Sequence, residues 1–320
     1  MKYVRRGLYV LLPLLIVLVG WTQRFEINDW WRLRGYDPPA RIVQLADQTA
    51  MTDLGRKLFY VNHPELNDKQ TFNDNCTISE QSIVLGCYVN SQGIYLYDVT
   101  DERLLGVHQV TAAHEMLHAA YDRLGMDEKT RVDKLTQEVF EQLNDARLNA
   151  TIQAYRDRDP SVIPNELHSI LATEVETLPT ELEDYYKQYF TDRQTVVRYS
   201  RQYEAAFQER KDKIAAFDAQ LAAIRQEIET NEAELTSLSA QISADRAELD
   251  ALLAARDYQR YNSRVPGFNQ KVRNYNATVN EIRAAIDTHN QLVIDRNAVA
   301  LEENELVEAI DSRPDTIPTE

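Results

Sequence analysis

Two histidines and a glutamate stand in the order His114-Glu115-x-x-His118. Residues four apart lie on one face of a helix, so both imidazoles can bind a single cation. The glutamate beside them is placed to take a proton from a metal-activated water molecule. The spacing therefore predicts a zinc-dependent hydrolase, with His114 and His118 as ligands of Zn²⁺ and Glu115 as general base.

The residues around the motif predict that it lies on a buried helix. The pattern is helical over residues 104–124, with Gly125 ending the helix, and most side chains between Val110 and Tyr121 are small or apolar. Three polar side chains on a buried helix need a partner, because burying them unpaired is costly. A zinc ion would be that partner.

A β-hairpin is predicted shortly before this helix. Residues 83–89 are β-branched and aromatic, residues 90–93 form a turn, and Ile94–Tyr97 follows as the second strand. We expect Ile94–Asp98 to be an edge strand, because a peptidase can bind an extended substrate along such an edge.

The motif after a hairpin resembles the zincin metallopeptidases over roughly residues 80–190, and the HExxH string is its only highly specific part. The longer variant with a third histidine is not present, because Tyr121 and Leu124 stand where that variant has Gly and His. The resemblance therefore implies a gluzincin-type site, in which a downstream glutamate on another helix is the third ligand.

Three glutamates compete for the third position. Glu166 is favoured, because Asn165-Glu166 resembles the Asn-Glu pair of thermolysin-like enzymes. The string Pro-x-Glu-x-x-small around it also resembles the ligand helix of lethal-factor-like peptidases. Glu174, two turns later, is the alternative, and Glu138, in a highly charged stretch, is the third candidate.

Supporting roles are predicted for a few more polar side chains. Asp122 is one turn beyond His118 on the same helix face and is expected to accept a hydrogen bond from a ligand imidazole. The candidates for stabilising the oxyanion of a tetrahedral intermediate are His168, Tyr185, Tyr186 and Tyr189.

The N-terminal residues predict a membrane segment over residues 1–22. Lys2, Arg5 and Arg6 precede an apolar run from Leu8 to Trp21, an order that leads the following chain out of the cytoplasm. No small-residue cleavage site follows, which favours an anchor; a cleaved signal peptide, giving a secreted protein, is the alternative. Two further tryptophans, Trp30 and Trp31, are typical of residues at a membrane–water interface.

The two cysteines, Cys76 and Cys87, lie close together in the sequence, without the further soft ligands that a metal site would need. In an extracytoplasmic domain we expect them to form a disulfide; two reduced core cysteines are the alternative.

The expected fold class is α+β. A zincin-like domain with a small sheet over residues 36–195 is followed by a long antiparallel helical coiled coil over residues 196–311. The segment Asn262–Gly267 is expected to break the two arms. Residues 312–320 are expected to form a disordered tail.

Charge excludes one class of function. The chain has 35 Lys and Arg against 51 Asp and Glu, a formal charge of -16, which argues against binding nucleic acid. The predicted function is a membrane-anchored endopeptidase that acts on extracytoplasmic protein or peptide. The alternative is an adaptor whose coiled coil binds a protein partner and whose zinc domain is inactive.

Overall fold

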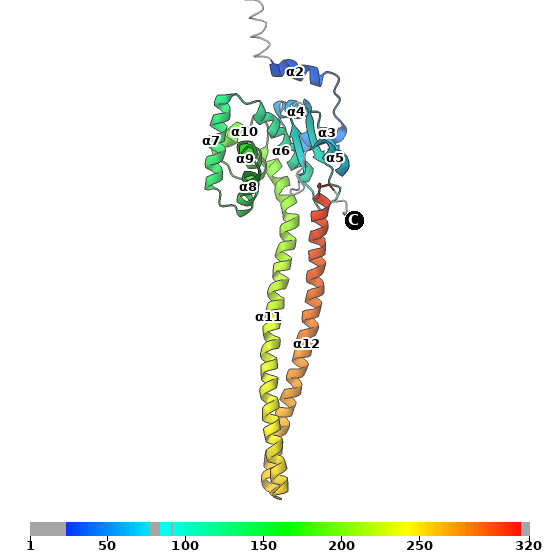
Figure 1. The fold of residues 1–320 in the computed structure, drawn as a ribbon, viewed down its shortest axis with the longest axis vertical. Helices are drawn as coiled ribbons and strands as arrows, with labels where there is room; N and C mark the ends of the chain where they lie inside the picture. The colour runs from blue at the N-terminus through cyan, green and yellow to red at the C-terminus, as the bar shows by residue number, and fades with distance from the viewer. Residues whose placement is uncertain (1–23, 77–83, 91, 315–320) are drawn as a thin grey trace, which may run out of the picture. The chain divides into compact units, whose positions relative to one another are not determined.

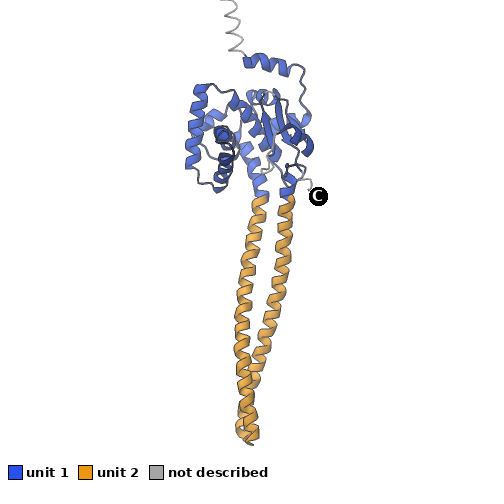
Figure 2. Cartoon of the chain, in the orientation of Figure 1, with its two compact units in different colours: residues 1–206, 306–320 blue, residues 207–305 orange. Residues whose placement is uncertain are grey.

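The computed structural model describes residues 24–76, 84–90 and 92–314. It is mostly helical, with one small sheet and two long helices. The chain divides into two compact units, residues 1–206 with 306–320, and residues 207–305 (Figure 2).

The described residues of the first unit form a sheet of three strands in the order β1-β3-β2. Strands β2 (Gly86–Val89) and β3 (Gly93–Tyr97) form the predicted antiparallel hairpin. Strand β1 (Glu65–Asn67) pairs in parallel with β3 on its other side. The expectation that the second hairpin strand is an edge strand is therefore wrong, because β1 covers that edge, and β2 is the edge strand of the hairpin.

A disulfide between Cys76 and Cys87 confirms the predicted pairing. It joins the end of helix α5 (Lys69–Asn75) to β2, with the two Cα atoms 6.1 Å apart. Closing a loop of this length contributes about 3 kcal/mol by restricting the unfolded chain.

Helix α6 (Val107–Asp122) carries the HExxH motif through the middle of the unit (Figure 1). It packs against β2 and β3 on one side and against α9 (Ile163–Glu174) on another. The remaining helices of this unit are α2 (Arg24–Leu33), α3 (Ala40–Gln48), α4 (Asp53–Tyr60), α7 (Met126–Gln142), α8 (Ala146–Arg158), the 3₁₀ turn η1 (Pro160–Val162) and α10 (Thr180–Tyr186).

The start of α6 depends on a glycine. Gly106 has a φ of +99°, in the left-handed region, and a Cβ atom there would lie 2.4 Å from the carbonyl oxygen of Tyr199. Only glycine fits both the backbone angle and the close approach. The helix is then continued by residues such as Ala112, Ala113 and Ala119, which favour helix and are small enough to be fully buried.

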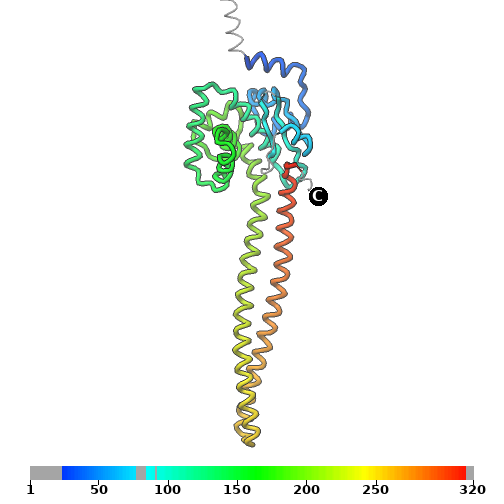
Figure 3. The backbone as a smooth tube through the Cα atoms, in the orientation of Figure 1, coloured from blue at the N-terminus to red at the C-terminus, as the bar shows by residue number. Residues whose placement is uncertain are grey.

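The second unit comprises most of two long helices, α11 (Arg193–Ala254) and α12 (Tyr258–Ile310), which Figure 3 shows as the yellow-green and orange tubes. They run antiparallel, with ion pairs between Arg296 and Asp218 (3.0 Å) and between Lys271 and Asp245 (2.8 Å). Leu238, Leu249 and Ile282 are buried between them. At 1.5 Å per residue α11 is roughly 90 Å long.

The turn between the long helices lies at Arg256, so the prediction of a break at Asn262–Gly267 is wrong. Arg256 adopts a left-handed φ of +56°. Its N–H donates to the carbonyl of Leu253, and that of Asp257 donates to the carbonyl of Leu252, the hydrogen-bond pattern of a Schellman motif. The Asp257 carboxylate then accepts from the backbone N–H of Arg260 and caps α12.

Pro266 lies inside α12 rather than at its boundary. The side chain is exposed. Water can therefore solvate the carbonyl that loses its helical partner, which limits the cost of the missing N–H. The proline was a misleading signal because the sequence alone does not show where the true turn is capped.

Two terminal predictions fall partly or wholly outside the described residues. The predicted membrane segment, residues 1–22, lies outside them. Among the residues that are described, no helix combines the length and the apolar character needed to cross a membrane. In the predicted tail, residues 312–320, Ser312 is buried and its hydroxyl donates a hydrogen bond to the carbonyl of Val84 (2.6 Å), whereas residues 315–320 are not described.

We predict that Arg256→Gly stabilises the second unit by about 1 kcal/mol, because a non-glycine residue pays that amount in the left-handed region. Thermal unfolding followed by circular dichroism measures the effect. The matched control is Arg246→Gly, an exposed position within α11, where the same change should destabilise by about 1 kcal/mol. Equal effects at both positions would contradict this account of the turn.

Candidate metal centre

The histidines of the motif lie one turn apart on α6, with their ring centroids 4.6 Å apart and the rings nearly perpendicular. Potential ligand atoms of His114, Glu115 and His118 all lie within 4.8 Å of one another. Both imidazoles are mostly buried, with side-chain exposures of 17% and 12%. The helix therefore presents two nitrogen ligands to one small space.

Glu166, in the first turn of α9, reaches the same space. Its Oε2 lies 3.5 Å from Nε2 of His114, and its Oε1 lies 3.7 Å from Nε2 of His118. Ligand atoms bound tetrahedrally at the distances typical of zinc are about 3.4 Å apart, close to both values. Glu166 Oε2 is buried and makes no hydrogen bond with any residue that the structure describes. A carboxylate oxygen left in this way, beside two imidazole nitrogens, fits a divalent cation.

Asn165 holds one of the two imidazoles. Nδ1 of His118 lies 2.9 Å from Oδ1 of Asn165, with the hydroxyl of Ser169 at 3.3 Å. An amide oxygen only accepts, so Nδ1 carries the proton and Nε2 keeps its lone pair for a metal. Asp122, the residue expected in this role, instead accepts a hydrogen bond from the side chain of Asn90 (3.1 Å).

Glu115 is buried between α6 and β2. The backbone N–H of Tyr88 donates to its carboxylate, and burial raises the pKa of Glu115 to about 7. A bound cation would lower this pKa, because it favours the charged carboxylate. Gly86 makes the close packing possible: a Cβ atom there would lie 2.5 Å from Cγ2 of Thr111 and 2.8 Å from Oε1 of Glu115.

Tyr155, on α8, closes the site behind Glu166. Burial raises the pKa of Tyr155, and the neighbouring carboxylate of Glu166 raises it further. Burial alone would also raise the pKa of Glu166, but His114, His118 and the Tyr155 hydroxyl outweigh it and hold that pKa below its usual value. Glu166 is therefore stabilised as a carboxylate, the form that binds a metal.

The other two candidates for the third ligand lie elsewhere. Glu174 ends α9 and forms an ion pair with Arg147 at 2.7 Å. Glu138 lies on α7 with its side chain 53% exposed, 3.7 Å from the ammonium group of Lys134. Among the residues that the structure describes, no hydrogen bond or ion pair joins either of them to a motif histidine, whereas Glu166 is close to both. The choice of Glu166 as the ligand stays a prediction.

The residues predicted to stabilise an oxyanion form a buried cluster of their own. His168 is fully buried, its Nε2 lies 3.0 Å from the hydroxyl of Tyr185, and burial lowers its pKa to about 3. The hydroxyl of Tyr186 donates to the backbone carbonyl of His168, and that of Tyr189 lies 3.3 Å from the Tyr185 hydroxyl. These polar groups bind one another, which suits a role in holding α9 and α10 together.

Sequence reasoning missed two side chains that contact the site. Asn165 was noticed only as the neighbour of Glu166, although its position in the first turn of α9 places it beside the same helix. Tyr155 gave no signal, because one of 17 tyrosines on a separate helix cannot be selected without the fold.

We predict that Glu166→Ala weakens zinc binding by more than about 100-fold, since loss of an outer hydrogen bond alone costs 10- to 100-fold. Glu174→Ala is the matched control on the same helix and should change the affinity by no more than a few-fold. Competition with a chromogenic chelator measures both. The reverse order would move the ligand to Glu174.

We further predict that Gly86→Ala destabilises the first unit by about 1–3 kcal/mol, because the new methyl group overlaps Thr111 and Glu115. Gly125→Ala is the control: nothing lies within 4 Å of a Cβ atom there, and its φ of -67° suits alanine. Chemical denaturation compares the two variants. Equal stability of both would mean that β2 can shift away from α6 at little cost.

No family model, curated protein or solved structure matches this chain. What is established is therefore a His-Glu-His cluster, close together on one buried helix, that could bind a metal ion. The likeness to gluzincins rests on the motif and on the position of Glu166.

Proposed function

We propose that this chain is a zinc-dependent endopeptidase with a gluzincin-type centre. The observation that carries the proposal is the approach of Glu166 to both motif histidines from a second helix, and Glu115, which lies close to both histidines, would be the base. A purely structural zinc site would need ligands but no base.

The donor set favours zinc. Two neutral imidazole nitrogens and one carboxylate oxygen, with an open fourth position, form a common catalytic zinc set. When bound there, zinc acts as a Lewis acid that polarises a substrate carbonyl and lowers the pKa of a water molecule. His114, His118 and Glu166 would hold the ion, and Asn165 and Tyr155 orient two of these ligands.

Glu115 would move the proton. In hydrolysis of a peptide bond, the water oxygen bonds to the carbonyl carbon while a water proton passes to the Glu115 carboxylate. When the C–N bond breaks, Glu115 returns this proton to the departing amine nitrogen. Its carboxylate lies next to the motif histidines and accepts a hydrogen bond from the backbone N–H of Tyr88 in β2, and in this proposal it acts as base and not as a ligand.

The substrate class follows from the strand beside the helix. In β2 the residues that pair with β3 through hydrogen bonds alternate with Gly86 and Tyr88, whose backbone groups face the free edge. One of these groups, the N–H of Tyr88, points at Glu115. The Tyr88 N–H is thus used by Glu115, and an extended peptide that pairs with the remaining backbone groups of this edge would pass the base, which favours a protein or peptide substrate.

The location proposed for this activity is extracytoplasmic. The Cys76–Cys87 disulfide supports an oxidising compartment, and the basic and apolar residues of the N-terminus support attachment to a membrane. The long helices α11 and α12 suit a coiled coil that binds a protein partner. The alternative function is accordingly an adaptor with an inactive zinc domain, which the retained Glu115 argues against.

We predict that Glu115→Gln keeps about one zinc per chain but lowers peptide cleavage by 10²- to 10⁴-fold, because an amide cannot accept the proton. Metal analysis of the purified full chain and mass spectrometry of a peptide library measure the two properties. Glu138→Gln, at an exposed position of α7, is the matched control and should leave both unchanged.

Two results would count against the enzyme. Cleavage by Glu115→Gln at the rate of the unaltered protein would show that Glu115 is not the base. Full zinc content with no cleavage of any peptide by the unaltered protein would favour the adaptor.

A further inference from the structure

Helix α2 has an inverted distribution of polarity. Asp29 points into the first unit and is only 1% exposed, whereas Ile27, Trp30 and Trp31 are 49%, 57% and 62% exposed. Soluble proteins normally place the carboxylate outside and the tryptophans inside. A helix that buries a carboxylate and exposes neighbouring aromatic rings is typical of a surface that binds an apolar partner.

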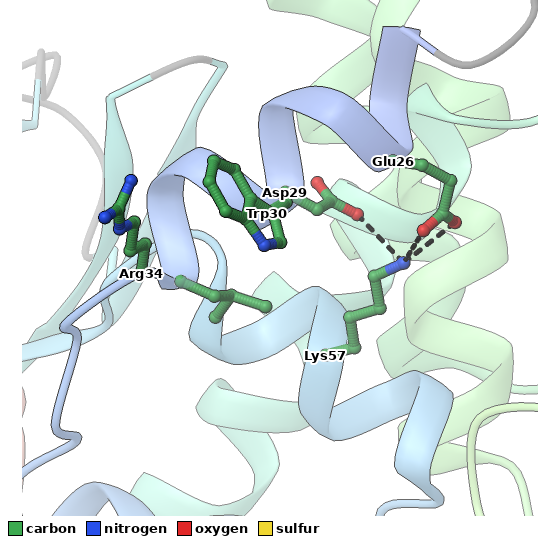
Figure 4. A pocket seen from close by; sticks show the side chains of 6 residues that line it. Glu26, Asp29, Trp30, Arg34 and Lys57 are labelled. Carbon is green, nitrogen blue, oxygen red and sulfur yellow. Dashed lines mark hydrogen bonds and ion pairs between the residues drawn. The ribbon is translucent and has the colours of Figure 1, made fainter.

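The inward side of α2 is fixed by ion pairs. Arg123, directly after α6, donates two hydrogen bonds of 2.8 Å to the Asp29 carboxylate. Lys57 on α4 lies 3.3 Å from the same carboxylate and is also bound to Glu26, as the dashed lines of Figure 4 mark. Turning α2 over would leave the buried charges of this network unpaired, so the tryptophans are held facing outward.

Further contacts hold the C-terminal end of α2. The guanidinium group of Arg32 donates to the backbone carbonyls of Val61 and Gln92, and the ring of His63 lies 2.8 Å from the carbonyl of Arg32. Both ends of the helix are therefore attached to the first unit. The exposed face is a fixed part of the surface and not a frayed end of the chain.

We propose that the exposed face of α2, formed by Ile27, Trp30, Trp31 and Arg34, docks on the surface of a phospholipid bilayer. Tryptophan is enriched where hydrocarbon meets the headgroups, and arginine can pair with lipid phosphate. The guanidinium group of Arg34 lies over the ring of Trp30 at 5.1 Å and beside a pocket of about 410 Å³, which places a cation among the rings (Figure 4).

The sequence before α2 selects this occupant over a protein partner. Residues 8–21 are almost wholly apolar, with three basic residues in the first six positions, and they end just before Arg24. A chain that leaves a bilayer there would bring the first turn of α2 to the lipid headgroups. The chain as a whole has a net charge of -16, so anionic lipid would repel it. Arg34 gives this face a local positive charge, which anionic lipid attracts.

Fluorescence quenching by brominated lipid tests the proposal on the full chain. Trp21→Phe with Trp31→Phe leaves Trp30 as the only tryptophan, and Trp21→Phe with Trp30→Phe leaves Trp31. In vesicles of phosphatidylcholine and phosphatidylglycerol with brominated acyl chains, each should lose about half or more of its emission and become shielded from aqueous iodide.

The matched control replaces all three tryptophans by phenylalanine and adds Leu105→Trp. Leu105 is 57% exposed and precedes α6, at the end opposite to Arg123 and roughly 24 Å away along the helix. This tryptophan should keep its emission in brominated vesicles and stay open to iodide.

Two outcomes would overturn the proposal. Unquenched and iodide-accessible Trp30 and Trp31 would show that this face stays in water. Unquenched but iodide-shielded rings would show that protein covers it. Because the readout uses neither metal nor cleavage, its result is independent of the proposed enzyme.

Discussion

The packing of α9 against α6 is the contact on which the candidate site depends. The two motif histidines come from one helix, but the space between them is completed only when the first turn of the second helix brings Glu166 to 3.5 and 3.7 Å. Ser169, one turn later, is fully buried and lies 3.3 Å from His118. A larger side chain at that position would push the helices apart and move the carboxylate out of reach.

Burying the two carboxylates at this contact costs free energy, although it also brings them next to the histidines. A buried carboxylate costs several kcal/mol unless charge or hydrogen bonds compensate it, and two carboxylates, Glu115 and Glu166, lie within the same small volume. The N–H of Tyr88 contacts the Glu115 carboxylate, and His114, His118 and the hydroxyl of Tyr155 act on Glu166. A divalent cation between the imidazoles would stabilise both carboxylates in their charged form.

The parts of the fold that depend on residues close together in the sequence were predictable from it. The motif helix, the hairpin and the disulfide each follow from periodicity, turn residues or short spacing. The central position of β3 in the sheet could not be predicted from the sequence. Its second neighbour, β1, has only three residues and comes from an earlier part of the chain. The turn at Arg256 was missed for a related reason: its left-handed residue is neither glycine nor asparagine, so no composition signal marks it.

The same limit applies within the site. His114, Glu115 and His118 could be named from their spacing, since a helix alone fixes which of them share a face. The hydrogen-bond partners of these residues could not be named, because they come from other helices and packing determines how those helices approach. Thus His118 is bound to Asn165, which is 47 residues away, and not to Asp122 on its own helix.

The ion pairs on the inward side of α2 fix the orientation of this helix relative to α6, which carries the motif. Arg123 caps the C-terminal end of α6, so the cation that holds Asp29 is attached directly to the helix that carries the motif. For stability alone, an apolar contact would serve as well, because a buried ion pair seldom gains more than it loses in desolvation. An apolar contact, however, would tolerate rotation of α2 about its axis, whereas a carboxylate bound by two cations does not. The charged interface therefore fixes which face of α2 points outward, and with it the direction in which α6 and its histidines lie relative to that face.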